Sequence, residues 1–317
     1  MGREAFGVVG YSIISFQIAL SQFSFTTTFI VFISSTVHQL CRASDVHVPP
    51  SWAVVGVTTL LFIPLGWIRR IGKMRIPTLI GDVIIVFAVL YVFVSAAVLI
   101  GRNGPSPAAV PWGDTKPTLR FVGTAIYSFE GIALVIPIRE SMHKPRLFPY
   151  VLTGMMALFA ALIASIGALG YVAWGPRVDT VILNELPGAG GKVVQMLYMV
   201  AVLFSFPLLI YPTFSICEAQ LFSGMLASTR RKLLKNAFRS LVTIAMGILA
   251  YAVDSNLSIF VSMVGSVCCI PLAITLPAML HMRIIGVHKW FNWLMALFGA
   301  CLTPLTFYID SMTWGGS

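Results

Sequence analysis

Residues 121–138 read Phe121-Val-Gly-Thr-Ala-Ile-Tyr-Ser-Phe-Glu-Gly-Ile-Ala-Leu-Val-Ile-Pro-Ile138, an apolar run with a single acid, Glu130, at its tenth position. A helix of about 20 apolar residues crosses a bilayer, so this run predicts a membrane span with Glu130 near the midplane. An ionised carboxylate at that depth costs several kcal/mol. Such a residue faces a cavity or a partner, or it is protonated. We therefore expect Glu130 to be the residue that matters most for function.

The same run predicts a helix that is easily interrupted. Gly123 and Gly131 weaken it, and Thr124 and Ser128 add hydroxyls that make unwinding easier. Transporters use the backbone N–H and C=O groups of broken helices to bind substrates and ions. The candidate substrate-binding residues are Thr124, Ser128, Phe129 and Gly131. Glu130 is the candidate proton-coupling group; the alternative is a structural Glu that bonds to a neighbouring helix.

The composition places most of the chain in lipid. Of its 317 residues 58% are apolar and 10% are charged, and the mean hydropathy is +0.90. Soluble domains carry about a quarter charged residues. These values exclude an ordinary cytosolic enzyme, a disordered protein and a nucleic-acid-binding module.

Charge-free runs predict nine membrane spans in one all-α transmembrane domain covering residues 1–317. The expected spans are 8–36, 52–68, 77–101, 120–138, 149–174, 192–220, 237–253, 256–280 and 290–310. Lipid leaves backbone groups without water to bond to, so each span is predicted to be a helix. The seventh is long enough only if Arg239 extends along the helix towards the membrane surface.

The basic residues predict the orientation. If the N-terminus is cytoplasmic, fifteen of the 21 basic residues fall on cytoplasmic connections, and six acids, including Asp310, fall on the opposite side. Cytoplasmic loops are enriched in Lys and Arg. The net charge of +10 is therefore a sign of topology and does not indicate a nucleic-acid partner.

Other polar positions give weaker signals. Ser21 and Gln22 begin a polar stripe on the first span and are candidate cavity-lining residues. Glu218 stands at the cytoplasmic end of its span, where we expect a solvated side chain. No phosphate-binding loop, metal-ligand spacing or cluster of catalytic side chains is present, so we expect no ATP, metal or other cofactor and no enzyme activity.

The chain resembles the amino acid/auxin permease family, in particular its fungal vacuolar amino acid transporters. The resemblance rests on the 121–132 motif, on Ile136-Pro-Ile-Arg-Glu-Ser-Met142, on the region from Gly167 to Pro187, and on Phe206-Pro-Leu-Leu-Ile-Tyr-Pro212. It implies proton-coupled symport of amino acids, neutral ones in particular, across a vacuolar or lysosome-like membrane. It also implies two inverted five-helix repeats followed by an eleventh helix.

The family pattern has eleven spans, and we predict nine for this chain. The first span here resembles the third of the family, and residues 121–138 resemble the sixth. We therefore expect a transporter that is truncated at its N-terminus and unstable or inactive alone, so that robust uptake by this chain would refute the expectation. The other alternative is a membrane sensor or scaffold that binds amino acids without moving them.

Overall fold

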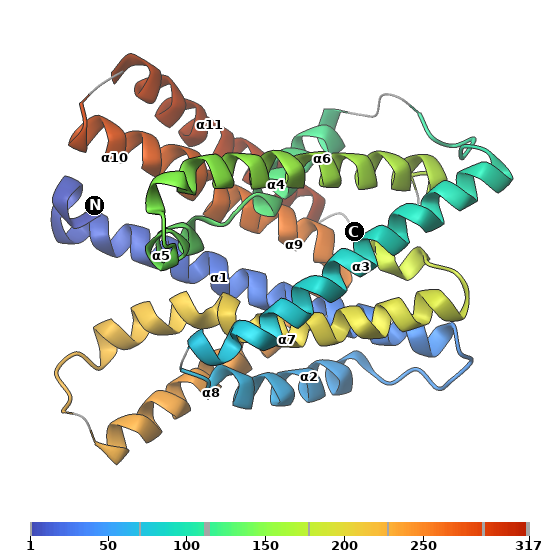
Figure 1. Cartoon of the computed structure of the whole chain (residues 1–317), viewed down its shortest axis with the longest axis horizontal. Coiled ribbons are helices and arrows are strands. Elements are labelled where there is room, and N and C mark those ends of the chain that lie inside the picture. Colours follow the sequence, from blue (N-terminus) through green and yellow to red (C-terminus); the bar gives the residue numbers. More distant parts are fainter. Residues whose placement is uncertain are drawn as a thin grey trace.

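The computed structural model describes residues 2–69, 71–110, 115–176, 178–226, 228–286 and 289–314. Within these ranges the chain forms helices and no strand. The helices make an elongated bundle whose turns gather at its two ends (Figure 1). This confirms the predicted class, a polytopic helical membrane bundle.

The helices follow one another with short connections. They are α1 (Gly2–Arg42), α2 (Ser51–Gly66), α3 (Ile71–Asn103), α4 (Thr115–Ser128), α5 (Ile132–Ser141), α6 (Phe148–Trp174), α7 (Gly188–Leu221), α8 (Thr229–Val253), α9 (Leu257–Val264), α10 (Leu276–Ile284) and α11 (Lys289–Trp314). Two π-helical segments, Gly265–Cys269 and Pro271–Thr275, join α9 to α10. Three 3-10 turns complete the list: Pro145–Leu147, Ile182–Glu185 and Asp254–Asn256.

The helices overlap the predicted runs, and several extend beyond them. Residues 149–174 were expected as a span, and α6 covers Phe148–Trp174. The backbone of α1 departs from helical geometry at Phe6 and Gly7, so its long part begins at residue 8, as expected. Among the described residues, six helical stretches are long and apolar enough to cross a membrane, one of them running from Thr229 to Ile284. The count of nine spans stays a prediction.

Hydrogen bonds show which connections share an end of the bundle. Arg69, after α2, donates to the carbonyl of Lys232 at 3.0 Å, near the start of α8. At the other end Lys192 of α7 donates to the carbonyl of Ala43 at 2.6 Å. Alternate connections therefore lie together, as the charge pattern predicts. We call the end with Arg69 the basic end. Arg70, Asp114 and Arg177 lie outside the described residues.

The core forms where α1 passes between α2, α7, α8 and α9. Phe62 of α2 stacks on Phe206 of α7 with ring centroids 4.1 Å apart, and both are fully buried. The buried hydroxyl of Thr27 on α1 donates to a carbonyl of its own helix at 2.9 Å. Thr213 of α7 donates to the carbonyl of Ala19 on α1 at 3.0 Å. Some hydroxyls of α1 thus bond to carbonyls of their own helix, while Gln22 Oε1 and the hydroxyls of Ser34 and Thr36 are buried without a partner among the described residues.

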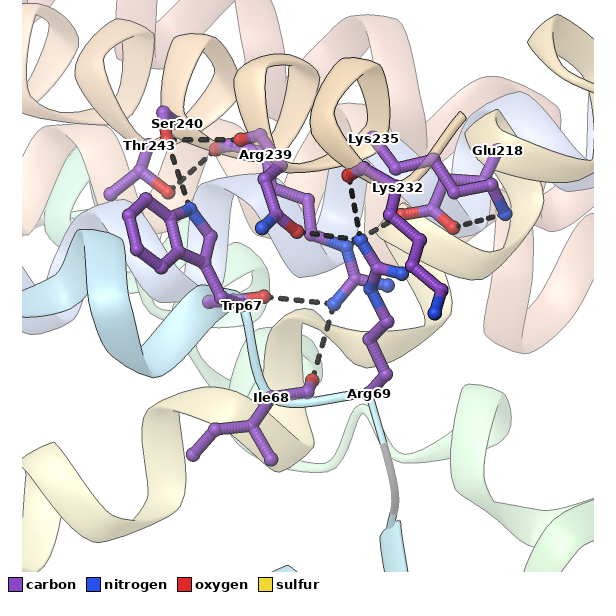
Figure 2. Close-up of polar contacts among 11 residues, drawn as sticks. Trp67, Ile68, Arg69, Glu218, Lys232, Lys235, Arg239, Ser240 and Thr243 are labelled. Atoms are coloured by element: carbon purple, nitrogen blue, oxygen red, sulfur yellow. Dashed lines mark hydrogen bonds and ion pairs between the residues drawn. The ribbon is translucent and has the colours of Figure 1, made fainter. Parts of the chain in front are cut away.

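Glu218 corrects one expectation. It is not a solvated helix end: the residue is 7% exposed, and its carboxylate accepts from Arg239 Nε at 2.5 Å and from Lys235 Nζ at 2.7 Å (Figure 2). Arg239 does not reach the membrane surface either, since it is 3% exposed. The two residues meet because α7 and α8 approach each other at the basic end, a pairing that spacing along one chain does not reveal.

Arg239 also closes the end of α2. Its Nη1 donates to the carbonyls of Gly66 at 2.8 Å and Ile68 at 3.1 Å. The last carbonyls of a helix have no partner within the helix. The guanidinium lies over the ring of Phe214, 4.9 Å from its centroid. One buried cation on α8 therefore binds the ends of α2 and α7.

Candidate functional site

The predicted interruption is present at Glu130. The helix α4 ends at Ser128, α5 begins at Ile132, and residues 129–131 between them are not helical. The N–H of Glu130 bonds to the carbonyl of Tyr127 at 3.3 Å, which closes a final turn on α4. Helix ends leave carbonyls at the C-terminus and N–H groups at the N-terminus without helical partners. The break therefore brings donors and acceptors together beside Glu130.

The carboxylate of Glu130 is buried at this break. Neither of its oxygens is accessible to solvent, and neither has a hydrogen-bond partner among the described residues. The N–H of Ile132, the first of α5, lies near the carboxylate but outside hydrogen-bond geometry. The carboxylate is also close enough to interact electrostatically with the thiols of Cys268 and Cys269 in the facing π segment. A buried carboxylate without a partner is stable only when neutral or when a ligand supplies one.

The segment facing the break is also irregular. Pro271 has no N–H for the carbonyl of Val267, four residues earlier, and the side chain of Gln17 on α1 donates to that carbonyl at 3.0 Å. The π-helical turns of 265–269 and 271–275 flank this point. Two non-α-helical segments therefore face each other, and π turns are frequent at functional sites.

Two glycines bring α4 against this segment. A Cβ atom on Gly265 would clash with the carbonyl oxygen of Gly123, and a Cβ atom on Gly123 would lie 2.7 Å from the carbonyl oxygen of Ser262. Both contacts are with backbone atoms, which cannot rotate away. Close packing of these backbones positions the last turns of α4 beside the π segment.

We expect Gly265→Ala to destabilise the protein by about 1–3 kcal/mol, because the added methyl group forces α4 away from its neighbour. The matched control is Gly167→Ala on the outer helix α6, where a Cβ meets no atom within 4 Å. That control should be neutral or slightly stabilising, because Ala favours helix. The thermal unfolding midpoints of the two purified variants test this prediction. Equal midpoints would contradict the close contact between Gly265 and the backbone of Gly123.

A cavity of about 450 Å³ adjoins α4 on the side away from the basic end. This volume lies within the range of small-molecule sites. Its walls are mostly apolar, with hydroxyls from Thr28, Thr124, Tyr127, Tyr198 and Ser258, and no charged residue lines it among those described. Thr180 adds a further hydroxyl, and the other lining residues are Phe29, Phe32, Ala88, Val89, Val92, Ile166, Val181, Ile182, Leu183, Val202, Leu257 and Val261.

The candidate binding residues of the motif have different surroundings. Thr124 lines the cavity. The hydroxyl of Ser128 donates to the carbonyl of Thr124 at 3.0 Å, within α4. The ring of Phe129 packs edge-on against Phe159 of α6, with centroids 5.6 Å apart. Gly131 borders open space, since a Cβ there would meet no atom within 4 Å. Their roles in binding stay predictions.

Ser21 and Gln22 lie deep in α1, away from the lining of this cavity. Ser21 is fully buried, and its hydroxyl donates to the carbonyl of Ile18 at 3.0 Å. Gln22 is 2% exposed, and its Oε1 has no partner among the described residues. The α1 wall of the cavity is formed instead by Thr28, Phe29 and Phe32, two to three turns further along the helix.

Sequence reasoning missed two groups near the site. Asp310 was expected at the surface, but it is fully buried in α11, where it accepts from the hydroxyls of Ser262 at 3.0 Å and Ser266 at 3.2 Å. The two serines stand one turn apart in an apolar span, which was the available signal. Tyr127 donates to the hydroxyl of Thr28 at 3.0 Å and so links α4 to α1. No group of three potential metal ligands occurs in the described parts of the chain.

The family described as "Transmembrane amino acid transporter protein" matches residues 1–316. The chain belongs to this family. The family description names transporters, which supports the expectation that the chain is not an enzyme. No solved structure matches the chain significantly.

Curated relatives of the chain come from fungi and plants. It is 38% identical to "Vacuolar amino acid transporter 3" of Schizosaccharomyces pombe, over 84% of this chain and 41% of that protein. It is 32% identical to "Vacuolar amino acid transporter 4" of Saccharomyces cerevisiae, over 89% and 44%. "Amino acid transporter AVT3C" of Arabidopsis thaliana is 28% identical over 92% and 69%. The chain thus spans less than half the length of these fungal relatives, and the resemblance to the fungal branch is confirmed.

Proposed function

We propose that this chain forms the substrate-binding part of a carrier that moves neutral amino acids across a vacuolar membrane, coupled to protons. The observation that carries the proposal is the break between α4 and α5, with the buried, unpartnered carboxylate of Glu130 at its centre. Family membership and the names of the relatives support amino acids as the substrates and the vacuole as the location.

An amino acid is complementary to such a break. Its carboxylate would accept from N–H groups at the start of α5, and its ammonium group would donate to carbonyls at the end of α4. The dipoles of the two helices favour this orientation. An ionised Glu130 would place a negative charge beside the N–H of Ile132, where it repels a substrate carboxylate, and protonation would remove that repulsion. Substrate binding and protonation would then be linked.

The cavity supports a neutral side chain as cargo. Its described lining has hydroxyls and apolar groups but no charge, and its volume accommodates a large apolar side chain. Burying an unpaired charge in such a site is costly. We place the basic end of the bundle in the cytoplasm, by the excess of Lys and Arg there, and expect export from the acidic vacuole, with the whole chain acting as one transporter domain.

Flux measurements test this proposal. The chain covers 41% of the S. pombe relative, so we assay a chimera in which the chain replaces the matching segment of that relative. The assay uses sealed vacuolar vesicles that contain the chimera. We expect an imposed pH gradient to drive flux of labelled leucine. Unlabelled neutral amino acids should compete, and lysine and glutamate should compete about 100-fold less well, because of charge burial. Flux that does not depend on the pH gradient would contradict the proposal. Binding of leucine without flux, as expected of a sensor, would also contradict it.

A further inference from the structure

A cluster of cations lies at the basic end, where the turn after α2 meets the start of α8. We define the basic cluster as Arg69, Arg230, Arg231, Lys232, Lys235 and Arg239. We propose that its outer members bind the headgroup of an anionic phospholipid. This proposal concerns a surface away from the α4–α5 break, and it does not depend on transport.

The charge of the cluster is not balanced internally. Glu218 is already bound by the two inner cations, Lys235 and Arg239. The side chains of Arg230 and Lys232 are exposed and have no hydrogen-bond or ion-pair partner among the described residues. These two cations are therefore available to an anion from outside the protein.

The other outer cations are held in place. Arg69 donates to Asn236 Oδ1 at 2.6 Å as well as to the carbonyl of Lys232, and it leans against α8 (Figure 2). Arg231 donates through Nη2 to the carbonyl of Phe222 at 2.9 Å, and its Nε is shielded from solvent without a partner among the described residues. Fixed guanidinium groups with unused donors are well suited to phosphate.

The position of these cations in α8 is unfavourable by itself. Ser228 caps the helix by accepting from the N–H of Arg231 at 3.2 Å, so Arg230, Arg231 and Lys232 occupy the first turn. The N-terminus of a helix carries partial positive charge, which repels cations. An anion bound at this turn offsets both the partial positive charge of the helix end and the charges of the three side chains.

Neighbouring apolar side chains favour a lipid over a soluble anion. Leu226 is 90% exposed, and Leu221 and Leu233 are also exposed on the same stretch. Exposed leucines close to a run of Lys and Arg at the end of a span suit the membrane interface, where apolar groups enter the acyl boundary and cations meet phosphates. The proposed ligand therefore belongs to the leaflet at the basic end, the cytosolic one in the predicted orientation.

Binding of short-chain lipids to the purified full chain in uncharged detergent tests the proposal. The probes are dioctanoyl phosphatidylserine, dioctanoyl phosphatidylcholine and glycerophosphoserine, which is the headgroup without tails. The test variant is Arg230→Ala with Lys232→Ala. The matched control, Arg42→Ala with Arg102→Ala, removes the same charge from two exposed residues at the opposite end.

We expect phosphatidylserine to bind more tightly than phosphatidylcholine. The Arg230/Lys232 variant should bind phosphatidylserine about 30-fold more weakly, because each cation contributes a factor of about five. The control variant should bind phosphatidylserine as tightly as the unsubstituted chain. Equal losses in the two variants, or equal binding of both lipids, would overturn the proposal. Glycerophosphoserine binding as tightly as the lipid would show a soluble-anion site and overturn the lipid assignment.

A measurement on the unsubstituted chain keeps the proposal testable if the variant folds poorly. The affinity for phosphatidylserine should fall as salt is raised, because interactions of exposed charges are screened. An affinity that does not change with salt would contradict a role for the exposed cations. The unfolding midpoint of each lipid-free variant shows whether its fold is intact.

Discussion

Arg239→Ala is expected to destabilise the protein by about 3–5 kcal/mol, because it removes the buried partner of Glu218 and leaves that carboxylate with only the partly solvated ammonium group of Lys235. It also removes the donor to the carbonyls of Gly66 and Ile68 at the end of α2. Polar groups that are buried without a partner cost further free energy. In thermal unfolding of the detergent-purified chain, the midpoint should fall by roughly 5–10 °C.

Lys235→Ala provides the matched control within the same cluster. The ammonium group of Lys235 binds the same carboxylate, but its side chain is 20% exposed, and Glu218 keeps its bond to Arg239 when it is removed. Partly solvated ion pairs contribute about 1 kcal/mol or less. A midpoint for Lys235→Ala as low as that of Arg239→Ala would show that Arg239 does not have the structural role described here.

Features encoded within one segment could be predicted from the sequence. Charge-free runs located the helices because lipid excludes unpaired charge, and the predicted end of the fifth span at 174 matches α6. The interruption at Glu130 was also predictable. An acid near midplane beside Gly131 lowers the cost of leaving the helix, and α4 and α5 separate at that point.

Contacts between distant segments could not be predicted. Glu218 and Asp310 were both expected at membrane surfaces, but each is buried against partners on another helix, Arg239 and Ser262. The cavity beside α4 likewise takes its walls from six helices and the 180–183 segment. A single sequence specifies which faces are apolar but not which helix covers each face. The polar pairs that complete the fold therefore come only from the structure.

Glu130→Gln is expected to abolish the dependence of amino acid flux on a pH gradient. Gln has nearly the shape of a protonated Glu, so it preserves packing at the α4–α5 break but cannot take up or release a proton. Flux driven by the gradient should fall to the level measured without one. The matched control is Glu140→Gln, which makes the same chemical change on an exposed side chain of the last turn of α5.

The proposed role of the buried carboxylate at the break is to couple protons to amino acid movement. It is tested most directly by the ratio of leucine flux with and without an imposed pH gradient, in vesicles that carry the unsubstituted chimera, Glu130→Gln or Glu140→Gln. We predict a ratio of one for Glu130→Gln and an undiminished ratio for Glu140→Gln. A Glu130→Gln variant that retains the full stimulation by the gradient would contradict the account.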